Sequence, residues 1–447
     1  MAKRISSLLL IIFLGVCLAS CSNRQILLFL NWGEYIDESL IEAFEEKENC
    51  TVVMDLGESN EIFYSKISGG TTLYDVVCPS DYMVEKLYNN DMLLKLDFQK
   101  LPTYSSIYNS NGLLSGVNSI MNMMESDCEG ISSYFVPYLW GTWGIMYSTL
   151  NPGLEEAVTN NENEWASLFD RSVLPANTKV AMYDSHQHAY YAACQYLGLD
   201  YSSGELGENE LDQIFNLVKD MKFDAWGTDN IKKDIVAKNI DVGFMWTGDF
   251  LYYYCETIAN KVIDAYLNKD IDVDDFNTIL QALLNKEVYT SNGNSYEVGF
   301  DIFIPQNTIA FCDNLVITKD AQHQDLAYKF IDFLCSNSVI VDDVNLQPAY
   351  QNTYYVCYNT PFVSVYDEIT SLSANTFNND DINNFNLETK NGVDPYDSTL
   401  YYKLYDFAIG EAFRKYYPKD ENKGNILHPF SRNYVNIINR TFNNARA

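Results

Sequence analysis

The chain is poor in basic residues and in histidine. Its 447 residues include 29 Lys and Arg against 61 Asp and Glu, with four His, for a formal net charge of −32. Binding to nucleic acid requires clustered Lys and Arg, so this balance argues against a nucleic-acid partner. The same charge is compatible with attraction of a cationic ligand, and equally with solubility alone.

Motifs for metal binding and common hydrolases are also missing. The ten cysteines are scattered without a C-x-x-C pair, and there is no H-E-x-x-H or G-x-S-x-G. We therefore expect no metal, no cofactor and no enzymatic activity. A secreted hydrolase using Glu34 and Asp313 as a carboxylate pair is the weaker alternative. Several of the cysteines after Cys21 lie in apolar runs and are expected to be small buried side chains, although export would permit some to oxidise.

A long apolar run occurs only at the N-terminus. Lys3 and Arg4 precede the apolar segment Leu8–Val16, which is typical of an export signal and too short to span a membrane comfortably. The following "LASC" resembles a bacterial lipobox, which implies lipidation of Cys21 and anchoring to the bilayer. A plain secretory signal with a chance cysteine is the alternative. We expect a signal peptide at residues 1–20 and a tether at 21–25.

Strand-like and helix-like segments alternate along the rest of the chain. Strands are expected at residues 26–30, 50–56, 74–80 and 178–184, and at 239–249, where a turn should follow the strand; helices are expected from Asp37, and at 60–69, 81–91, 185–198 and 321–337. This order indicates an α/β protein with parallel, helix-covered sheets in two lobes. Two segments resemble insertions, 268–294 and 375–397, and the second is expected to be a poorly ordered surface loop.

Six segments resemble, in order, the pattern of spermidine/putrescine-binding proteins. They are "NWGEY", "GESNEIFYSKI", "YDVVCPSDYMVEKL", "VPYLWGTWGIMY", "VGFMWTGDF" and "CDNLVITKDAQHQDLAYKFIDFL". The resemblance covers most of residues 26–350 and is weak beyond. It implies a two-lobe, periplasmic-binding-protein-like fold of type II, with a ligand cleft between the lobes and hinge closure. The implied lobes are residues 26–139 with 313–350, and 140–312 with 351–447.

The resemblance also implies a function. The chain would be the extracytoplasmic substrate-binding subunit of an ABC importer, held outside the cell membrane through Cys21. It would capture a polyamine and deliver it to permease subunits driven by a cytoplasmic ATPase. A monomer is expected. A polyamine needs carboxylates for its ammonium groups and aromatic faces for its methylenes, which also offer cation–π attraction.

The first matching segment places three side chains at the end of an apolar strand. By the resemblance, Trp32 and Tyr35 wall the ligand, and Glu34 meets an amine or orients a neighbour. Without the resemblance, a core tryptophan beside a solvated glutamate would be the simpler interpretation.

Five further residues are implied at the site. Ser80 supplies a hydroxyl acceptor and Tyr82 an aromatic wall, although a helix N-cap and a packed tyrosine are the structural alternatives. Asp313 matches the acidic residue that grips an amine. Trp246 matches an aromatic position, with packing between lobes as its alternative, and Phe311 stands where the family has Trp.

The sequence departs from the family pattern in the second half of the site. Asp184 matches one acidic position, but Ser185 and His188 stand where carboxylates would be. A neutral His188 could accept a hydrogen bond from an ammonium, whereas a protonated one would repel it. Gln347 replaces a tyrosine. Asp249 is a speculative replacement for the lost acid, and these changes suggest a smaller or differently spaced cation.

Other ligands and roles remain open from the sequence. Thiamine, another small organic cation or ferric iron would suit a related binding protein. Tyr190 and Tyr191 form a pair like the tyrosines of iron binders, but helix packing is favoured because adjacent helical residues point about 100° apart. An adhesin or purely structural lipoprotein would bind no small ligand.

Overall fold

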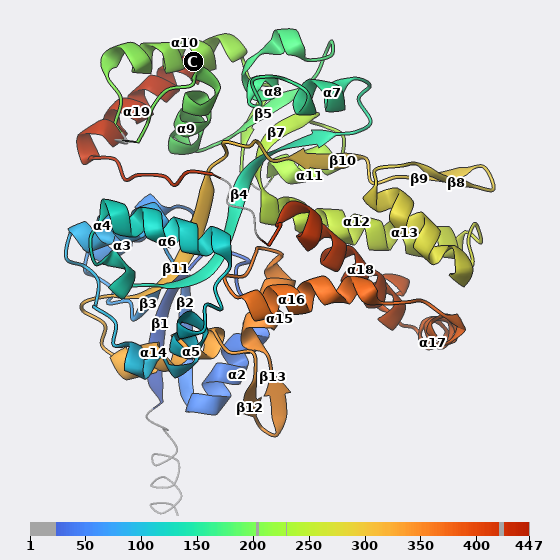
Figure 1. Cartoon of the computed structure of the whole chain (residues 1–447), viewed down its shortest axis with the longest axis horizontal. Helices are drawn as coiled ribbons and strands as arrows, with labels where there is room; N and C mark the ends of the chain where they lie inside the picture. Colours follow the sequence, from blue (N-terminus) through green and yellow to red (C-terminus); the bar gives the residue numbers. More distant parts are fainter. Residues whose placement is uncertain (1–23, 203–204, 229, 420–423, 447) are drawn as a thin grey trace, which may run out of the picture.

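The computed structural model describes residues 24–202, 205–228, 230–419 and 424–446 (Figure 1). The expected signal peptide and the expected lipidation site Cys21 lie outside the described residues. Within them, no helix combines the length and apolar character needed to cross a bilayer. The cysteines from Cys50 to Cys357 are all buried with free thiols, which confirms the expectation of small buried side chains.

One half of the molecule is built on β1, in which Leu27, Phe29 and Leu30 are buried and Ile26 is exposed. It contains β1 (Gln25–Asn31), α2 (Glu38–Glu48), β2 (Cys50–Leu56), α3 (Asn60–Ser68), β3 (Val76–Val77), α4 (Asp81–Asn89), α5 (Pro102–Asn109), α6 (Ser115–Asp127), β11 (Ala310–Ile317) and α14 (Gln324–Leu334). β1 pairs in parallel with β2 and β3, and β11 runs antiparallel to β3. Asp37 caps α2 through a 3.0 Å hydrogen bond from the Ser39 amide. We call this half the N-lobe.

The other half, the C-lobe, has a second parallel sheet. It contains α7 (Leu154–Thr159), α8 (Ala166–Phe169), β5 (Val180–Tyr183), α9 (His186–Leu197), α10 (Glu208–Met221), β6 (Ala225–Gly227), α11 (Asn230–Val236), β7 (Val242–Trp246), β10 (Phe300–Phe303) and α19 (Arg432–Arg446). β5 lies between β6 and β7 and is parallel to both. Gly198 ends α9 in the left-handed conformation (φ 64°), as its position predicted.

Strand β4 (Val136–Ser148) joins the two sheets. Its first part pairs with β11 up to Thr142–Ala310, and its second part pairs with β7 and β10 from Trp143 onward. All of its side chains are buried. The sheet is therefore continuous, in the order β2-β1-β3-β11-β4-β7-β5-β6, and β4 changes partners between Thr142 and Trp143.

The remaining elements are α12 (Thr247–Leu267), α13 (Phe276–Leu284), β8 (Tyr289–Ser291), β9 (Asn294–Tyr296), β12 (Val339–Val341), β13 (Val344–Leu346), α15 (Pro348–Val356), α16 (Val363–Ser371), α17 (Asn379–Lys390) and α18 (Thr399–Tyr416). Most of them lie to the right in Figure 1, whereas β12 and β13 lie at the bottom beside α2. α12 begins directly after β7, so the expected turn is wrong there.

The expectation of a poorly ordered loop at 375–397 is also wrong, because the segment contains α17. Asn378 and Asp381 form a capping box at its start, and Asp380 adds a favourable negative charge to the first turn. Phe385 is buried against Tyr266, with ring centroids 5.5 Å apart. The polar composition of this segment therefore did not indicate the helix, which is stabilised by its N-terminal capping box and by the buried Phe385 ring.

Candidate functional site

The Asp313 carboxylate lies where two loops of the N-lobe meet β11. The Tyr35 hydroxyl donates to its Oδ2 at 2.7 Å, and the Ser80 hydroxyl donates to its Oδ1 at 2.5 Å. Asn60 Nδ2 in turn donates to Ser80 Oγ at 3.0 Å. Tyr35 follows β1 and Ser80 follows β3, whose carboxyl ends share one edge of the sheet. A register shift in β11 between Asp313 and Asn314 accompanies this placement, as bulges often do beside functional sites.

Burial dominates the electrostatics of this carboxylate. Asp313 is 5% exposed, and burial raises its pKa to about 6, against the opposing effect of the hydrogen bonds from Ser80 and Tyr35. In the described part of the chain, no Lys or Arg forms an ion pair with it. The site thus holds a buried acid without a cationic partner from the described residues, which is the arrangement a cationic ligand would complete.

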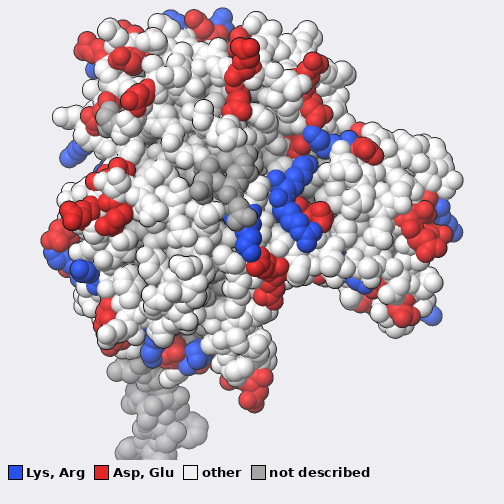
Figure 2. Space-filling model, viewed as in Figure 1, with Lys and Arg blue, Asp and Glu red and all other residues white. Residues whose placement is uncertain are grey.

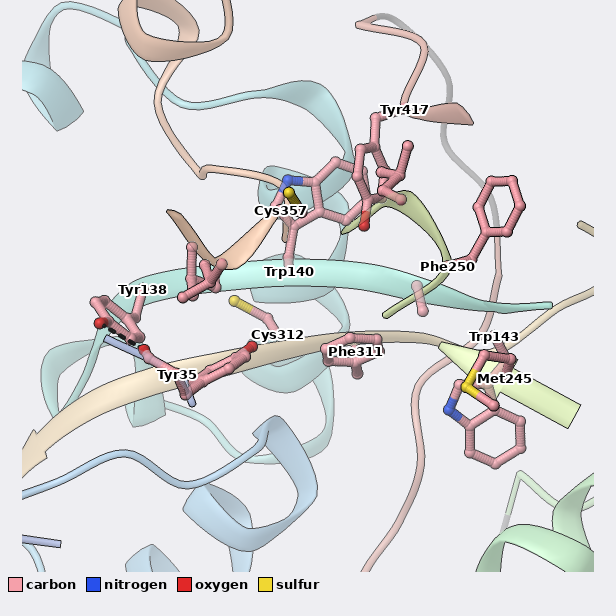
Figure 3. Packing of buried hydrophobic residues seen from close by; sticks show 14 of the residues in the cluster. Tyr35, Tyr138, Trp140, Trp143, Met245, Phe250, Phe311, Cys312, Cys357 and Tyr417 are labelled. Carbon is pink, nitrogen blue, oxygen red and sulfur yellow. Dashed lines mark hydrogen bonds between the residues drawn. The ribbon is translucent and has the colours of Figure 1, made fainter. Parts of the chain in front are cut away.

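Aromatic rings extend from Asp313 into the C-lobe. Adjacent ring centroids lie 5.1 Å apart for Tyr35 and Tyr358, 6.1 Å for Tyr358 and Phe311, and 5.0 Å for both Phe311–Trp246 and Trp246–His188. We call these five side chains the aromatic wall. Figure 3 shows Tyr35 and Phe311 along β11, below Trp140 and Tyr417. The wall therefore links residues expected at the site in both halves of the sequence.

His188 is part of this wall as a neutral ring. Its Nδ1 lies 2.6 Å from the Ser185 hydroxyl, and its ring packs 5.1 Å from Trp143. Burial lowers the pKa of His188 to about 3. The imidazole therefore stays uncharged at physiological pH and does not repel a cation.

Tyr358 is a member of the wall that sequence reasoning missed. Cys357 ends α15 with φ 59°, and the next residues return to β4 through a bridge between Asn359 and Trp140. The Tyr358 ring lies against Gly248, where an added Cβ would be 2.5 Å from the ring. Tyr358 lies beyond the segment that resembles the family, so the resemblance could not assign it to the site.

Asp249 approaches the same ring from the start of α12. Burial raises the pKa of Tyr358 most, the charge of Asp249 comes second, and Tyr417, Tyr183 and Asp313 raise the pKa further. The charges of Asp249 on α12 and Asp313 on β11 thus both act on Tyr358. Asp249 forms a 2.7 Å ion pair with Lys232 of α11.

Two expected residues, Trp32 and Tyr82, contact residues of α3. Trp32 packs on Phe63 with ring centroids 4.4 Å apart, and the Tyr82 hydroxyl points toward Glu61 at 3.4 Å. Glu34 is exposed, with φ 52°. Ser80 precedes α4, but its hydroxyl bonds to Asp313 and does not cap the helix.

Two expected residues have side-chain partners in the C-terminal part of the chain. Asp184 is exposed and forms a 2.6 Å ion pair with Arg446 of α19. Gln347 donates to Glu368 of α16 at 3.0 Å. The C-terminal helices, which the resemblance covers poorly, supply the partners of both side chains, and a ligand role for either residue stays a prediction.

The tyrosine pair of α9 is packed inside the C-lobe. The Tyr190 hydroxyl lies 3.2 Å from that of Tyr434, and the Tyr191 hydroxyl donates to the His428 carbonyl at 2.9 Å. Both side chains are fully buried. This arrangement fits the favoured expectation of helix packing.

Comparisons with known proteins identify related sequences. The family model described as bacterial extracellular solute-binding protein matches residues 39–350. A putrescine/cadaverine-binding protein of Pseudomonas aeruginosa is 25% identical over 332 residues, covering 73% of this chain and 79% of that protein. The spermidine/putrescine-binding periplasmic protein of Escherichia coli is 26% identical over 240 residues, covering 53% of this chain and 62% of that protein.

A solved structure from Listeria monocytogenes, of a protein assigned to a spermidine/putrescine ABC transporter, has the same fold. Its TM-score is 0.62 at 20% sequence identity, and the match covers 94% of this chain and 99% of that chain. The expected α/β fold of the two-lobe, periplasmic-binding-protein-like type is thereby confirmed.

Proposed function

Because the chain belongs to the bacterial extracellular solute-binding protein family, we propose that it is the substrate-binding subunit of an ABC importer for polyamines. The proposal is supported by the named ligands of its relatives, putrescine, cadaverine and spermidine. It performs no reaction: it captures the ligand and presents it to permease subunits that a cytoplasmic ATPase drives.

The buried Asp313 carboxylate carries this proposal. Tyr35 and Ser80 orient it, and the aromatic wall extends from it. An ammonium group would neutralise the buried acid, while the rings would cover the attached methylenes. The acidic surface supports capture of cations, and Figure 2 shows Asp and Glu side chains spread widely over the face in view.

We divide the chain into lobes as the sequence suggested, 26–139 with 313–350 and 140–312 with 351–447. The change of partners along β4 at Thr142 and Trp143 supports a crossing close to the first boundary. Because Asp313 is enclosed in this structure, the ligand enters when the lobes open by a hinge motion.

The proposed location is outside the cell membrane, anchored through lipidated Cys21. The apolar segment Leu8–Val16 and the "LASC" that ends at the cysteine support it. Labelling of cells with a radioactive fatty acid should mark the wild-type chain and leave Cys21→Ser unlabelled. Equal labelling of both proteins would contradict the proposal that Cys21 carries the lipid anchor.

Calorimetric titration of the chain without residues 1–21 against putrescine, cadaverine, spermidine and spermine tests the ligand class. We expect saturable binding with one ligand per chain, and its loss in Asp313→Asn. Thiamine and ferric ion belong in the same panel, since tight binding of either, without amine binding, would replace the polyamine proposal. Binding without product formation separates a receptor from the hydrolase alternative.

A further inference from the structure

Each carboxylate expected to face an amine in the C-lobe already has a cationic partner from the chain. Asp249 pairs with Lys232 at 2.7 Å, and Asp184 pairs with Arg446 at 2.6 Å. The guanidinium of Arg446 also lies over the Trp226 ring at 4.2 Å, which fixes it in place. In the N-lobe, Asp313 has no such partner among the described residues.

The Lys232–Asp249 pair differs from the exposed Asp184 pair because it is buried. The side chains of Lys232 and Asp249 are 9% and 16% exposed. A buried pair of this kind is held together firmly, since removal of either partner leaves an uncompensated charge. Lys232 therefore stays on Asp249 and is not readily displaced by a ligand.

This pair borders the aromatic wall. Asp249 directly follows Gly248, and the backbone of Gly248 is in contact with the Tyr358 ring. Tyr358 packs on Tyr35, whose hydroxyl bonds to Asp313. A continuous path of contacts thus leads from the Lys232 ammonium to the Asp313 carboxylate.

We propose that Lys232 is a specificity-determining residue, which fills the ammonium position at Asp249 and leaves Asp313 as the buried ammonium site. This inference rests on the proposed polyamine function and narrows it. A short diamine places one ammonium at Asp313 and keeps the other away from Lys232. A longer triamine brings a further ammonium toward Lys232, where like charges repel in a poorly solvated environment.

The test is titration of putrescine and spermidine into wild-type protein and into Lys232→Met, Lys232→Gln and Lys232→Arg. In wild type we expect putrescine to bind at least tenfold more tightly than spermidine. The Met and Gln variants should improve spermidine binding about tenfold, because Asp249 becomes available to its ammonium. The Arg variant keeps the charge and should keep the wild-type preference.

Two controls separate charge from folding. Gln can still donate a hydrogen bond to Asp249. If Lys232→Met does not fold, the affinities of Lys232→Gln for putrescine and spermidine therefore still test the effect of removing the charge. Lys403→Met removes the lysine of another partly buried pair, with Asp381 at 2.8 Å on α17, and should change neither affinity. Adding Asp249→Asn to Lys232→Met should abolish the gain for spermidine.

The outcomes distinguish this inference from the function it refines. If wild type binds no amine, the polyamine function fails. If wild type binds amines but prefers spermidine, or if folded Lys232→Gln keeps the wild-type ratio, only the assignment of Lys232 is overturned.

Discussion

The Tyr35 hydroxyl donates a 2.7 Å hydrogen bond to the Asp313 carboxylate across 278 positions of sequence. It joins the loop after the first strand to a strand that returns from the C-lobe. Such a bond to an ionised, buried group is worth on the order of 1.5–3 kcal/mol. It both stabilises the charge and fixes the orientation of the carboxylate that we assign to the ligand.

Replacing Tyr35 by Phe should therefore weaken amine binding roughly tenfold while leaving the fold intact, since the ring is kept. Calorimetry at pH 7.5, with melting curves for both proteins, measures the two effects. Tyr108→Phe is the matched control, because Tyr108 is 51% exposed on α5. Unchanged affinity in Tyr35→Phe would separate Asp313 from ligand binding.

Amine affinity should fall at acidic pH. The ligand requires ionised Asp313, whose pKa of about 6 in the free protein means that protonation competes below that value. Between pH 7.5 and pH 5 the loss should be about tenfold, the ratio of ionised fractions for such a group. Asp313→Asn, if it retains measurable binding, should show a flat profile.

The same pKa has the opposite effect on the stability of the ligand-free protein. Folded Asp313 holds its proton more tightly than the unfolded chain does, so its contribution to stability is lost as pH rises through about 6. At pH 8, Asp313→Asn should therefore melt no lower than wild type, without any shift on addition of amine. A much lower melting temperature would show that the carboxylate is required for folding.

His188 should contribute no pH dependence between pH 5 and pH 8. Burial lowers its pKa to about 3, so the ring is neutral throughout this range. His188→Gln should keep the pH midpoint of binding seen in wild type, whatever its effect on affinity. A displaced midpoint would show that the imidazole titrates there.

Gly248→Ala should disturb the site through Tyr358. The added methyl would lie 2.5 Å from the ring, so the ring must move. We expect at least tenfold weaker amine binding, although alanine normally stabilises a helix by about 0.5–1 kcal/mol relative to glycine. In a Tyr358→Ala background the same substitution should cost nothing further, and an additive loss would contradict this contact.

Asp184→Asn and Gln347→Ala should leave amine affinity within twofold of wild type. Their side chains are already engaged by Arg446 and Glu368. The pair between Asp184 and Arg446 is partly exposed, so its loss should cost at most about 1 kcal/mol of stability. A large loss of amine affinity in either variant would show that the substituted residue takes part in ligand binding.

The N-lobe part of the fold and site was predictable because the information is local. Apolar strands, the Asp37 cap and the position of Ser80 at a strand end all follow from neighbouring residues. The resemblance assigned Tyr35, Ser80 and Asp313 to one site, and the structure brings their side chains into hydrogen-bonding contact, while the role of Asp313 toward an amine stays a prediction.

The C-lobe part was less accessible because its contacts are distant in sequence and lie beyond the segments that resemble the family. No local sequence pattern predicts that Arg446 forms an ion pair with Asp184, or that the Tyr358 ring packs against Gly248. Likewise, the spacing of Lys232 and Asp249 becomes meaningful only once α11 and the start of α12 pack side by side.

The route of β4 has a mechanical consequence. The partners of β4 change just past the pairs Gly141–Phe311 and Leu139–Asp313. The strands that twist when the two halves move are therefore the same strands that carry the side chains proposed to bind the amine. A permease that separates the halves would pull directly on these peptide units. Opening of the two halves and release of the ligand would then occur in the same step, without an intermediate change elsewhere in the protein.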